Sequence, residues 1–526
     1  MKQFDRIALV IRPSQFLKFS VWLVFVGAGF YSAPLRAEEG AATVSITNTL
    51  SGGYNLDNGN GDSDDDNYGL IQNKFNLQGS SGGLLTWIRF DVTQFTRELN
   101  PDKYHNDYNL ERFQVTHPLG HFKLTVGDFY KQVGRGIVLM LRKGDEVTPD
   151  GAIRGGELVW TEGNHQVEIF GGWLNQSNVD PVATKYFEEQ DDILAGYQYA
   201  FRGGQNLKLG NHGLFYALEN GLESTASAGL SLDAADITDW SSFYVESNLQ
   251  SRQGSVEPMG YSAYGALDMF WGDSLVLLEL IWLKNFQQQL NTDPLKSAVN
   301  RPPTLLRLQD ELAVVRGDEV GGRIRFEEYF EDSELTLYVN GMYRIFHPGE
   351  ALLKEDEYQV FLGAELPYQE GRSRLKLEVG YRDVFQDKCD LHFSQKAITH
   401  GYMDWVQYIS DGYSLHILSD NEYWQKDELV GRCQSTRKKY LRGSTFVGVE
   451  KAGLGDISFE LGYDKDPASA QSNSLFYAGI ASWKISSDII LKTIGGTQRG
   501  GLKCVSGVCR NFPAFVGVKA ELVVRY

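Results

Sequence analysis

The sequence predicts one all-β domain, a transmembrane antiparallel β-barrel of about 24 strands (about 22–26) with short periplasmic turns and long extracellular loops. Three observations predict it: an N-terminal export signal, apolar and polar residues that alternate with a period of two, and connections that alternate in length. No composition break or Pro/Gly/Ser-rich linker divides the 526 residues, so we expect a single domain over residues 38–526.

Residues 1–37 have the pattern of a signal peptide. The apolar stretch Phe19–Tyr31 is shorter than the roughly 20 residues that a spanning helix needs. Leu35-Arg36-Ala37 places a small residue at the cut position, so we expect cleavage after Ala37 and export from the cytoplasm. The alternative is an uncleaved N-terminal anchor. The basic residues before the apolar stretch are Lys2, Arg6, Arg12 and Lys18.

The charge balance is acidic. The chain has 50 Lys and Arg against 68 Asp and Glu, a net charge of -18. Residues 1–37 contain five basic residues and one acidic residue, so their removal would lower the net charge to -22. This balance disfavours nucleic acid as a partner and suits a cation-attracting pore or a surface bridged by divalent ions.

Alternation with a period of two is clearest in residues 374–382. Leu375, Leu377 and Val379 lie on one face, and Arg374, Lys376 and Glu378 lie on the other. In a transmembrane barrel the apolar face contacts lipid and the charged face lines the lumen, whereas a soluble sandwich would need a second sheet. The same alternation is found in residues 323–327, 335–344 and 457–464.

Short and long connections alternate along the chain, as in outer-membrane barrels. Short turns are expected at residues 80–83, 119–121, 162–164, 271–273, 331–333, 369–371, 410–412 and 486–488. Long connections are expected at residues 55–67, 96–107, 131–151, 175–191, 286–316, 346–355, 384–396, 425–439, 465–474 and 499–511. Residues 200–260 show no clear pattern. The first strand is expected to begin near Thr43, which leaves no room for a soluble plug domain.

The last residues alternate up to a terminal aromatic and are expected to close the barrel. They resemble the C-terminal strand by which bacterial outer-membrane proteins are recognised for assembly. The resemblance implies a Gram-negative outer-membrane location, with the barrel assembly machinery, outer-membrane lipid and lipopolysaccharide as partners. The alternating residues are Val516, Val518, Ala520, Leu522, Val524 and Tyr526.

The four cysteines, Cys389, Cys433, Cys504 and Cys509, all fall in expected long connections. An even count in an exported protein suggests disulfides. Cys504 and Cys509 could close one loop, and Cys389 and Cys433 could join two loops. A zinc site is the competing interpretation, but no His lies near the Cys504/Cys509 pair.

The segment Gly127–Gly156, GDFYKQVGRGIVLMLRKGDEVTPDGAIRGG, is the most distinctive part of the chain. It resembles a motif of a large, functionally uncharacterised outer-membrane barrel family, in which GDFY is followed by GRG, an apolar stretch, a basic pair and RGG. The resemblance centres on these residues and extends loosely over the barrel. It implies a fold and a location but no activity.

Within this segment, Gly134 and Gly136 permit a sharp reversal, and residues 137–141 are too apolar for a solvated loop. One hypothesis is that the segment folds into the lumen and forms a charged constriction, which would select solutes by charge. The alternative is a hairpin that extends above the membrane. The constriction candidates are the cations Arg135, Arg142, Lys143 and Arg154, opposed by Asp145 and Glu146.

Two further patterns resemble sites for metal binding or catalysis. The acidic loop Asp57–Asn67 resembles a calcium loop, but Asn67 replaces the required Gly, so a solvated loop is favoured and we expect no metal or cofactor. His416 and Asp404 should be neighbours in the lumen if their hairpin pairs about residues 410–412, and such a pair could activate a nucleophile.

Three functions therefore remain open. A porin-like channel for passive or gated transport is the first. A surface or assembly scaffold with an occluded lumen and an unknown protein partner is the second. A hydrolase with its site on the barrel wall is the third. No soluble-enzyme motif such as HExxH, GxSxG or a Walker sequence is present in a supporting context, so an enzyme is not expected.

Overall fold

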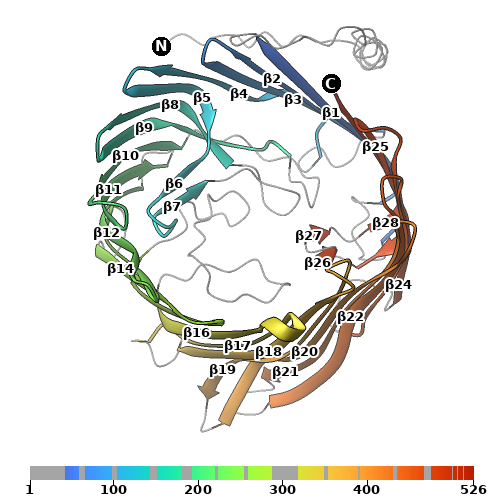
Figure 1. Ribbon diagram of the computed structural model, residues 1–526. Coiled ribbons are helices and arrows are strands. Elements are labelled where there is room, and N and C mark those ends of the chain that lie inside the picture. Colours follow the sequence, from blue (N-terminus) through green and yellow to red (C-terminus); the bar gives the residue numbers. More distant parts are fainter. Residues whose placement is uncertain are drawn as a thin grey trace.

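The computed structural model describes residues 42–58, 66–96, 104–141, 151–179, 192–218, 223–253, 259–286, 318–348, 354–388, 391–429, 435–466, 475–499, 501–505, 508–512 and 515–526. Twenty-four strands form one antiparallel sheet in which each strand pairs with its neighbours in sequence (Figure 1). The last strand pairs with the first, from Thr47↔Arg525 to Asn55↔Gly517, and closes the ring. The predicted barrel of about 24 strands is confirmed.

The strands of the ring fall into two halves of twelve. The first half comprises β1 Thr43–Asn55, β2 Tyr68–Ser81, β3 Leu84–Phe95, β4 Asp107–Leu119, β5 Phe122–Phe129, β8 Gly151–Glu162, β9 His165–Gln176, β10 Ile193–Arg202, β11 Leu207–Ala217, β12 Ser224–Thr238, β13 Ser241–Gln253 and β14 Met259–Trp271. The second comprises β15 Ser274–Lys284, β16 Glu319–Phe330, β17 Leu335–Phe346, β18 Glu355–Tyr368, β19 Ser373–Lys388, β20 Leu391–Ser410, β21 Tyr413–Leu429, β22 Ser435–Lys451, β23 Gly455–Asp464, β24 Leu475–Lys484, β25 Ile489–Gln498 and β28 Phe515–Arg525.

Two small hairpins lie outside this sheet. One pairs β6 Lys131–Val133 with β7 Leu139–Leu141, and the other pairs β26 Gly501–Val505 with β27 Val508–Phe512. The helical content of the described residues is one 3-10 turn, η2 Glu331–Ser333. No helix in this part of the chain is long and apolar enough to cross a bilayer.

The connections follow the expected alternation in length. Two-residue turns join β2 to β3, β4 to β5, β8 to β9, β14 to β15 and β20 to β21 at one end of the barrel. Long connections, such as the one between β15 and β16, lie at the opposite end, which faces outward in barrels of this class. The described part of residues 200–260, which the sequence left unassigned, contains β11, β12, β13 and the adjoining ends of β10 and β14.

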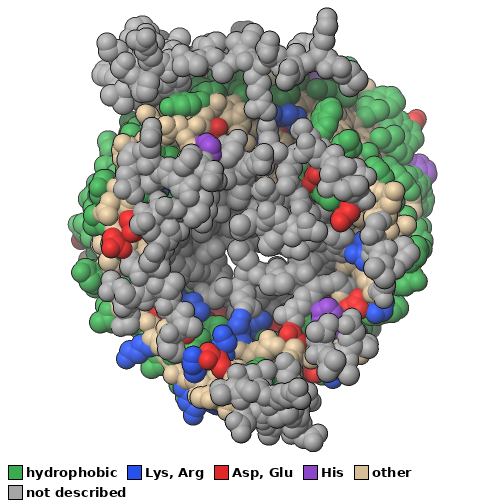
Figure 2. Space-filling view, turned by 180° about the vertical axis from the view of Figure 1, so that it is seen from behind, with side chains coloured by type: hydrophobic (Ala, Val, Ile, Leu, Met, Phe, Trp, Pro, Cys, Tyr) green, Lys and Arg blue, Asp and Glu red, His purple; other side chains and the backbone are tan. Residues whose placement is uncertain are grey.

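The outer face of the ring is apolar. On β19, Leu377 and Val379 are 43% and 56% exposed, while Arg374, Lys376 and Glu378 lie on the inner face. Hydrophobic side chains likewise cover the left and right of the outer rim in Figure 2. In water such exposure would be unfavourable, so the face contacts hydrocarbon and the chain is a transmembrane barrel of the outer-membrane type.

The alternation makes a test possible with two adjacent strands. Leu362 of β18 faces outward and is 56% exposed, and Thr336 of β17 lies on the inner face. Leu362→Arg should lower the free energy of unfolding by about 2–4 kcal/mol, because a guanidinium group must enter the hydrocarbon. Thr336→Arg should change it far less, because its new charge faces the lumen. Urea unfolding in lipid vesicles measures both, and equal losses would contradict the assigned faces.

Candidate functional site

The chain leaves the barrel wall after Phe129 and enters the lumen as the β6–β7 hairpin (Figure 1). We call residues 130–141 the inward segment. Its apolar side chains are buried against the inner wall, with Val133, Ile137 and Leu139 fully buried. The wall residues in this cluster come from β5, β8–β11, β13–β15 and β17. They are Phe129, Ile153, Phe170, Leu174, Leu194, Leu214, Tyr216, Tyr244, Tyr264, Ile281, Leu283 and Met342.

An ion-pair group anchors the start of the inward segment. Lys131 Nζ lies 3.1 Å from Glu157 Oε1 and also contacts the Glu168 carboxylate, so one cation bridges β8 and β9. All three side chains are nearly buried. Burial lowers the pKa of the Lys131 ammonium group, and the nearby Glu157 carboxylate opposes that shift. Losing Lys131 would therefore leave two carboxylates buried together without a cation.

The tip of the inward segment is anchored by polar contacts. The backbone N–H of Arg135 donates to Glu246 Oε2 of β13 (2.8 Å), and that of Gly134 donates to Gln198 Oε1 of β10 (3.3 Å). Gln198 Nε2 donates in return to the Gln132 carbonyl oxygen (2.9 Å). The Arg135 guanidinium group is exposed and lies over the Tyr244 ring, 4.2 Å from its centroid. Arg135 therefore presents a positive charge to the lumen beside the wall.

The wall is incomplete where the chain turns inward. β4 pairs with β5 through Gln114–Leu119, but β5 ends at Phe129, whose partner on β8 is Ile153. Residues 107–113 of β4 therefore extend beyond the last β5 pair. In a membrane wall their backbone groups still need hydrogen-bond partners, because hydrocarbon offers none.

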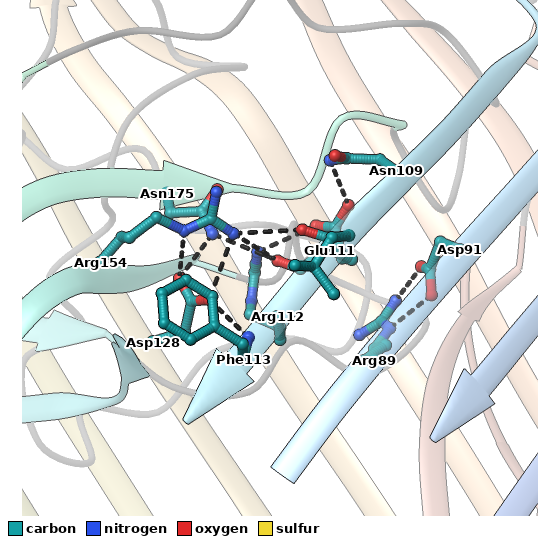
Figure 3. Close-up of polar contacts among 10 residues, drawn as sticks. Arg89, Asp91, Asn109, Glu111, Arg112, Phe113, Asp128, Arg154 and Asn175 are labelled. Atoms are coloured by element: carbon teal, nitrogen blue, oxygen red, sulfur yellow. Dashed lines mark hydrogen bonds and ion pairs between the residues drawn. The ribbon is translucent and has the colours of Figure 1, made fainter. Parts of the chain in front are cut away.

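Side chains supply those partners, as Figure 3 shows. Arg154 Nη2 of β8 donates to the carbonyl oxygens of Leu110 (3.3 Å) and Glu111 (3.1 Å). Asn175 Nδ2 of β9 also donates to the Glu111 carbonyl oxygen (3.2 Å). The Phe113 N–H donates to Asp128 Oδ2 (2.8 Å). These contacts replace the missing part of the β5 ladder.

Asp128 is the centre of this group and is fully buried. Besides the Phe113 N–H, it accepts hydrogen bonds from Arg154 Nε (3.1 Å) and Asn175 Nδ2 (2.7 Å). The Asp128 cluster, which we define as Asp128, Arg154 and Asn175, thus joins β4, β5, β8 and β9. A buried carboxylate with several donors is stable only while those donors stay in place.

Two glycines of the distinctive sequence motif are required by this geometry. Gly127 has a φ of +107°, and a Cβ there would lie 2.2 Å from the Phe113 carbonyl oxygen. Gly134 has a φ of +58°, and a Cβ there would lie 2.5 Å from the Glu246 carboxylate. Any larger residue would be strained at either position and would displace the neighbouring strand or carboxylate. The motif therefore matches the points at which the chain leaves the wall and reverses.

The predicted site residues have different locations. Arg135 lies at the tip of the inward segment, and Arg154 lies in the wall, bound to Asp128. Arg142, Lys143, Asp145 and Glu146 lie outside the described residues, so the opposed charge rows stay a prediction. Cys389 and Cys433 also lie outside them, whereas the backbone register places Cys504 opposite Cys509.

Sequence reasoning missed the residues that hold the segment. Asp128 lies inside the GDFY motif, and its position between Gly127 and an aromatic residue was a usable signal. Lys131 was visible in the same motif. Asn175, Glu157 and Glu246 had no distinguishing sequence pattern, because each is one polar residue among many on an inner barrel face.

Histidine–carboxylate pairs lie on the inner face of β20 and β21. His416 Nε2 lies 2.7 Å from Asp404 Oδ1, which confirms the expected neighbours, and Arg374 Nη2 donates to Asp404 Oδ2 (2.5 Å). His400 Nε2 lies 2.9 Å from Asp420 Oδ1. Within the described residues, no hydroxyl or thiol hydrogen-bonds to His416, and no group of three His, Cys, Asp or Glu is arranged to hold a metal. The pairs are explained by satisfied polar groups in a wet lumen.

No protein-family model matches the chain, and no curated protein matches it. Among solved structures, the P pilus usher PapC translocation pore is similar over 92% of this chain and 99% of its own, at 8% identity and a TM-score of 0.44. Pseudomonas aeruginosa OccK2 (OpdF) in complex with glucuronate is similar over 65% of this chain and 92% of its own, at 12% identity and a TM-score of 0.40. Pseudomonas aeruginosa OpdK with vanillate is similar over 65% of this chain and 94% of its own, at 12% identity and a TM-score of 0.41. These likenesses are too distant to bear on function, and the closed barrel rests on its own strand pairing.

The Asp128 cluster can be tested by stability. Asp128→Ala removes the carboxylate that pairs with the Arg154 guanidinium group and the acceptor of the Phe113 N–H, so we expect a loss of about 3 kcal/mol in the free energy of unfolding. Glu521→Ala is the control, because its pair with Lys492 joins β25 and β28 but is partly exposed, and should cost about 1 kcal/mol or less. Urea unfolding in vesicles measures both. Equal losses of unfolding free energy in the two variants would contradict a special role for the Asp128 cluster.

Proposed function

We propose that the protein is a porin-like channel through which solutes cross the outer membrane by a path between the inward segment and the opposite wall. The observation that carries this proposal is the position of the inward segment. It packs along one side of the ring, against β8–β11, β13–β15 and β17, and its apolar cluster contains no described residue of β18–β25. A ring of 24 strands is too wide for its wall side chains to fill the lumen.

The opposite wall has the chemistry of a water-filled path. The inner faces of β19–β22 hold charged and hydrogen-bonding side chains, including Lys376, Glu378, Tyr402, Asp420 and Arg442. Their contacts are ion pairs and hydrogen bonds, such as Lys376 Nζ to Glu378 Oε1 at 3.4 Å. Such a wall favours hydrated solutes over apolar ones.

The inward segment is a fixed constriction in this proposal and not a gate. Moving it would expose Val133, Ile137 and Leu139, each worth about 1.5–3 kcal/mol of burial. It would also separate Lys131 from two nearly buried carboxylates. The cost of release is therefore large compared with thermal energy, which supports a pore of constant width at this level.

Charge selection belongs to the same proposal. Arg142, Lys143, Asp145 and Glu146 follow the inward segment directly in sequence, between its end at Leu141 and the return to the wall at Gly151. We propose that they oppose each other across the path. The acidic balance of the mature chain favours cations in the rest of the lumen.

Processing and family are proposals of the same kind. We propose cleavage after Ala37 and membership of the uncharacterised barrel family with the GDFY, GRG and RGG motif. We also propose a disulfide between Cys504 and Cys509, because directly opposed residues in an antiparallel pair have Cα atoms about 4.5–5.5 Å apart, within the range of disulfides.

Replacing the inward segment tests the channel directly. Exchange of Lys131–Leu141 for a short Gly/Ser linker should raise single-channel conductance at least about twofold, because the path widens. The control is Gln132→Ser, which changes an exposed residue and keeps the buried ones. Planar-bilayer recordings measure both. Unchanged conductance in a folded variant would contradict the constriction, and silence of the wild-type protein would favour the scaffold function instead.

Neutralising the basic pair tests charge selection. Arg142→Gln with Lys143→Gln should shift the reversal potential in a KCl gradient toward stronger cation selectivity, because two positive charges leave the path. The control is Lys439→Gln with Lys465→Gln, which removes equal charge from exposed residues on the outer side of β22 and β23. If both pairs of changes give the same reversal potential as the wild type, the charged constriction is wrong.

A further inference from the structure

The outer face of β22 changes from apolar to basic toward the long-loop end. Val449, Val447 and Leu441 lie on this face and are exposed to the membrane. The next outward positions, Lys439 and Arg437, are also exposed. The change from hydrocarbon-compatible to cationic side chains therefore occurs within one strand, where the membrane core gives way to the outer-leaflet headgroups.

A third cation joins these two from the neighbouring strand. The backbone N–H of Lys465 donates to the Leu441 carbonyl oxygen (2.9 Å), which continues the β22–β23 ladder beyond Arg442↔Asp464. Lys465 is exposed and follows the outward positions Leu461 and Tyr463. Diagonal neighbours on one sheet face lie about 7–8 Å apart, so Lys465 is close to Lys439. We call Arg437, Lys439 and Lys465 the basic rim.

The basic rim holds more positive than negative charge. Arg437 bonds Asp427 through Nε and Nη2, both at 2.8 Å, but the Asp427 side chain is 3% exposed and that of Arg437 is 45% exposed. Among the described residues, neither Lys439 nor Lys465 forms an ion pair. Like charges at this spacing repel each other, and an anion placed between them would relieve the repulsion.

The rim also stands clear of the barrel mouth. β19–β22 have 16, 20, 17 and 17 residues, more than the roughly 9–11 that cross the membrane. Figure 1 shows ends of these strands standing away from the ring at the bottom of the view. In Figure 2, Lys and Arg side chains gather at the bottom of the rim. The cations therefore lie on the outside of the barrel and not on the solute path.

We infer that the basic rim binds the phosphate groups of lipopolysaccharide in the outer leaflet. Phosphate is the anion that Arg and Lys recognise most readily, through charge-assisted hydrogen bonds. The exposed apolar residues directly below the rim, Leu441 and Leu461, contact acyl chains of the same molecule. One amphipathic lipid thus satisfies both the cations and the apolar face, which a free anion cannot do. This site is independent of the lumen.

The test uses the full-length protein in detergent and labelled lipopolysaccharide. The triple variant Arg437→Gln, Lys439→Gln and Lys465→Gln should bind it at least about tenfold more weakly than the wild type, because each cation contributes to phosphate attraction. The control variant Lys123→Gln, Lys208→Gln and Lys484→Gln removes equal charge from exposed residues at the turn end and should bind normally. Urea unfolding shows that both variants are folded.

Two further arms distinguish the sources of phosphate. Wild-type protein should bind dephosphorylated lipopolysaccharide as weakly as the triple variant binds the intact lipid, and inorganic phosphate at millimolar concentration should not compete. Unchanged binding by the triple variant, equal loss in the control variant, or full competition by inorganic phosphate would each overturn the proposed lipid site.

Discussion

The structure depends on one constraint: inside a membrane every backbone N–H and C=O group must have a protein partner. The ladders of a closed ring meet it for paired strands, but the β4–β5 ladder stops where the chain leaves the wall after Phe129. There the Asp128 cluster provides the missing partners for β4, with Arg154 and Asn175 donating to the Glu111 carbonyl oxygen. Because side chains supply these hydrogen bonds, the inward segment can enter the lumen without leaving backbone groups of β4 unpaired in the hydrocarbon.

Because the inward segment packs against one side of the lumen, the two sides of the inner wall differ in polarity. Along β8–β15 the inner wall is partly apolar, because it packs against Val133, Ile137 and Leu139. Along β18–β25 it is mainly polar, as in the ion pair of Arg382 with Glu357 at 2.7 Å. In the proposed channel the solute path follows the polar half, so the inward segment would define both the width and the position of that path.

The distinctive motif acquires a physical meaning from the same arrangement. Gly127 and Asp128 lie where the chain leaves the wall, Gly134 and Arg135 lie at the tip of the inward segment, and Arg154 lies where the chain has returned. Residues nearly thirty positions apart in sequence thus serve one structural feature. The lipopolysaccharide site that we propose at the basic rim of the outer face depends on the length of β22 and not on the lumen.

The sequence by itself determined the barrel, a strand number of about 24 and the alternation of short and long connections, because a sheet between lipid and water imposes a period of two on nearly every strand. It failed over residues 200–260 for a physical reason. On β11 the inner-wall residues Leu214 and Tyr216 face the inward segment instead of water, and on β12 small residues such as Ala226 and Ala228 occupy the outer face, so the contrast between the two faces is weak there. The tertiary structure alone decided how the inward segment is held, because strand register brings Asp128 next to Asn175 and places Glu246 at the tip of the segment, and no pattern along the chain indicates either.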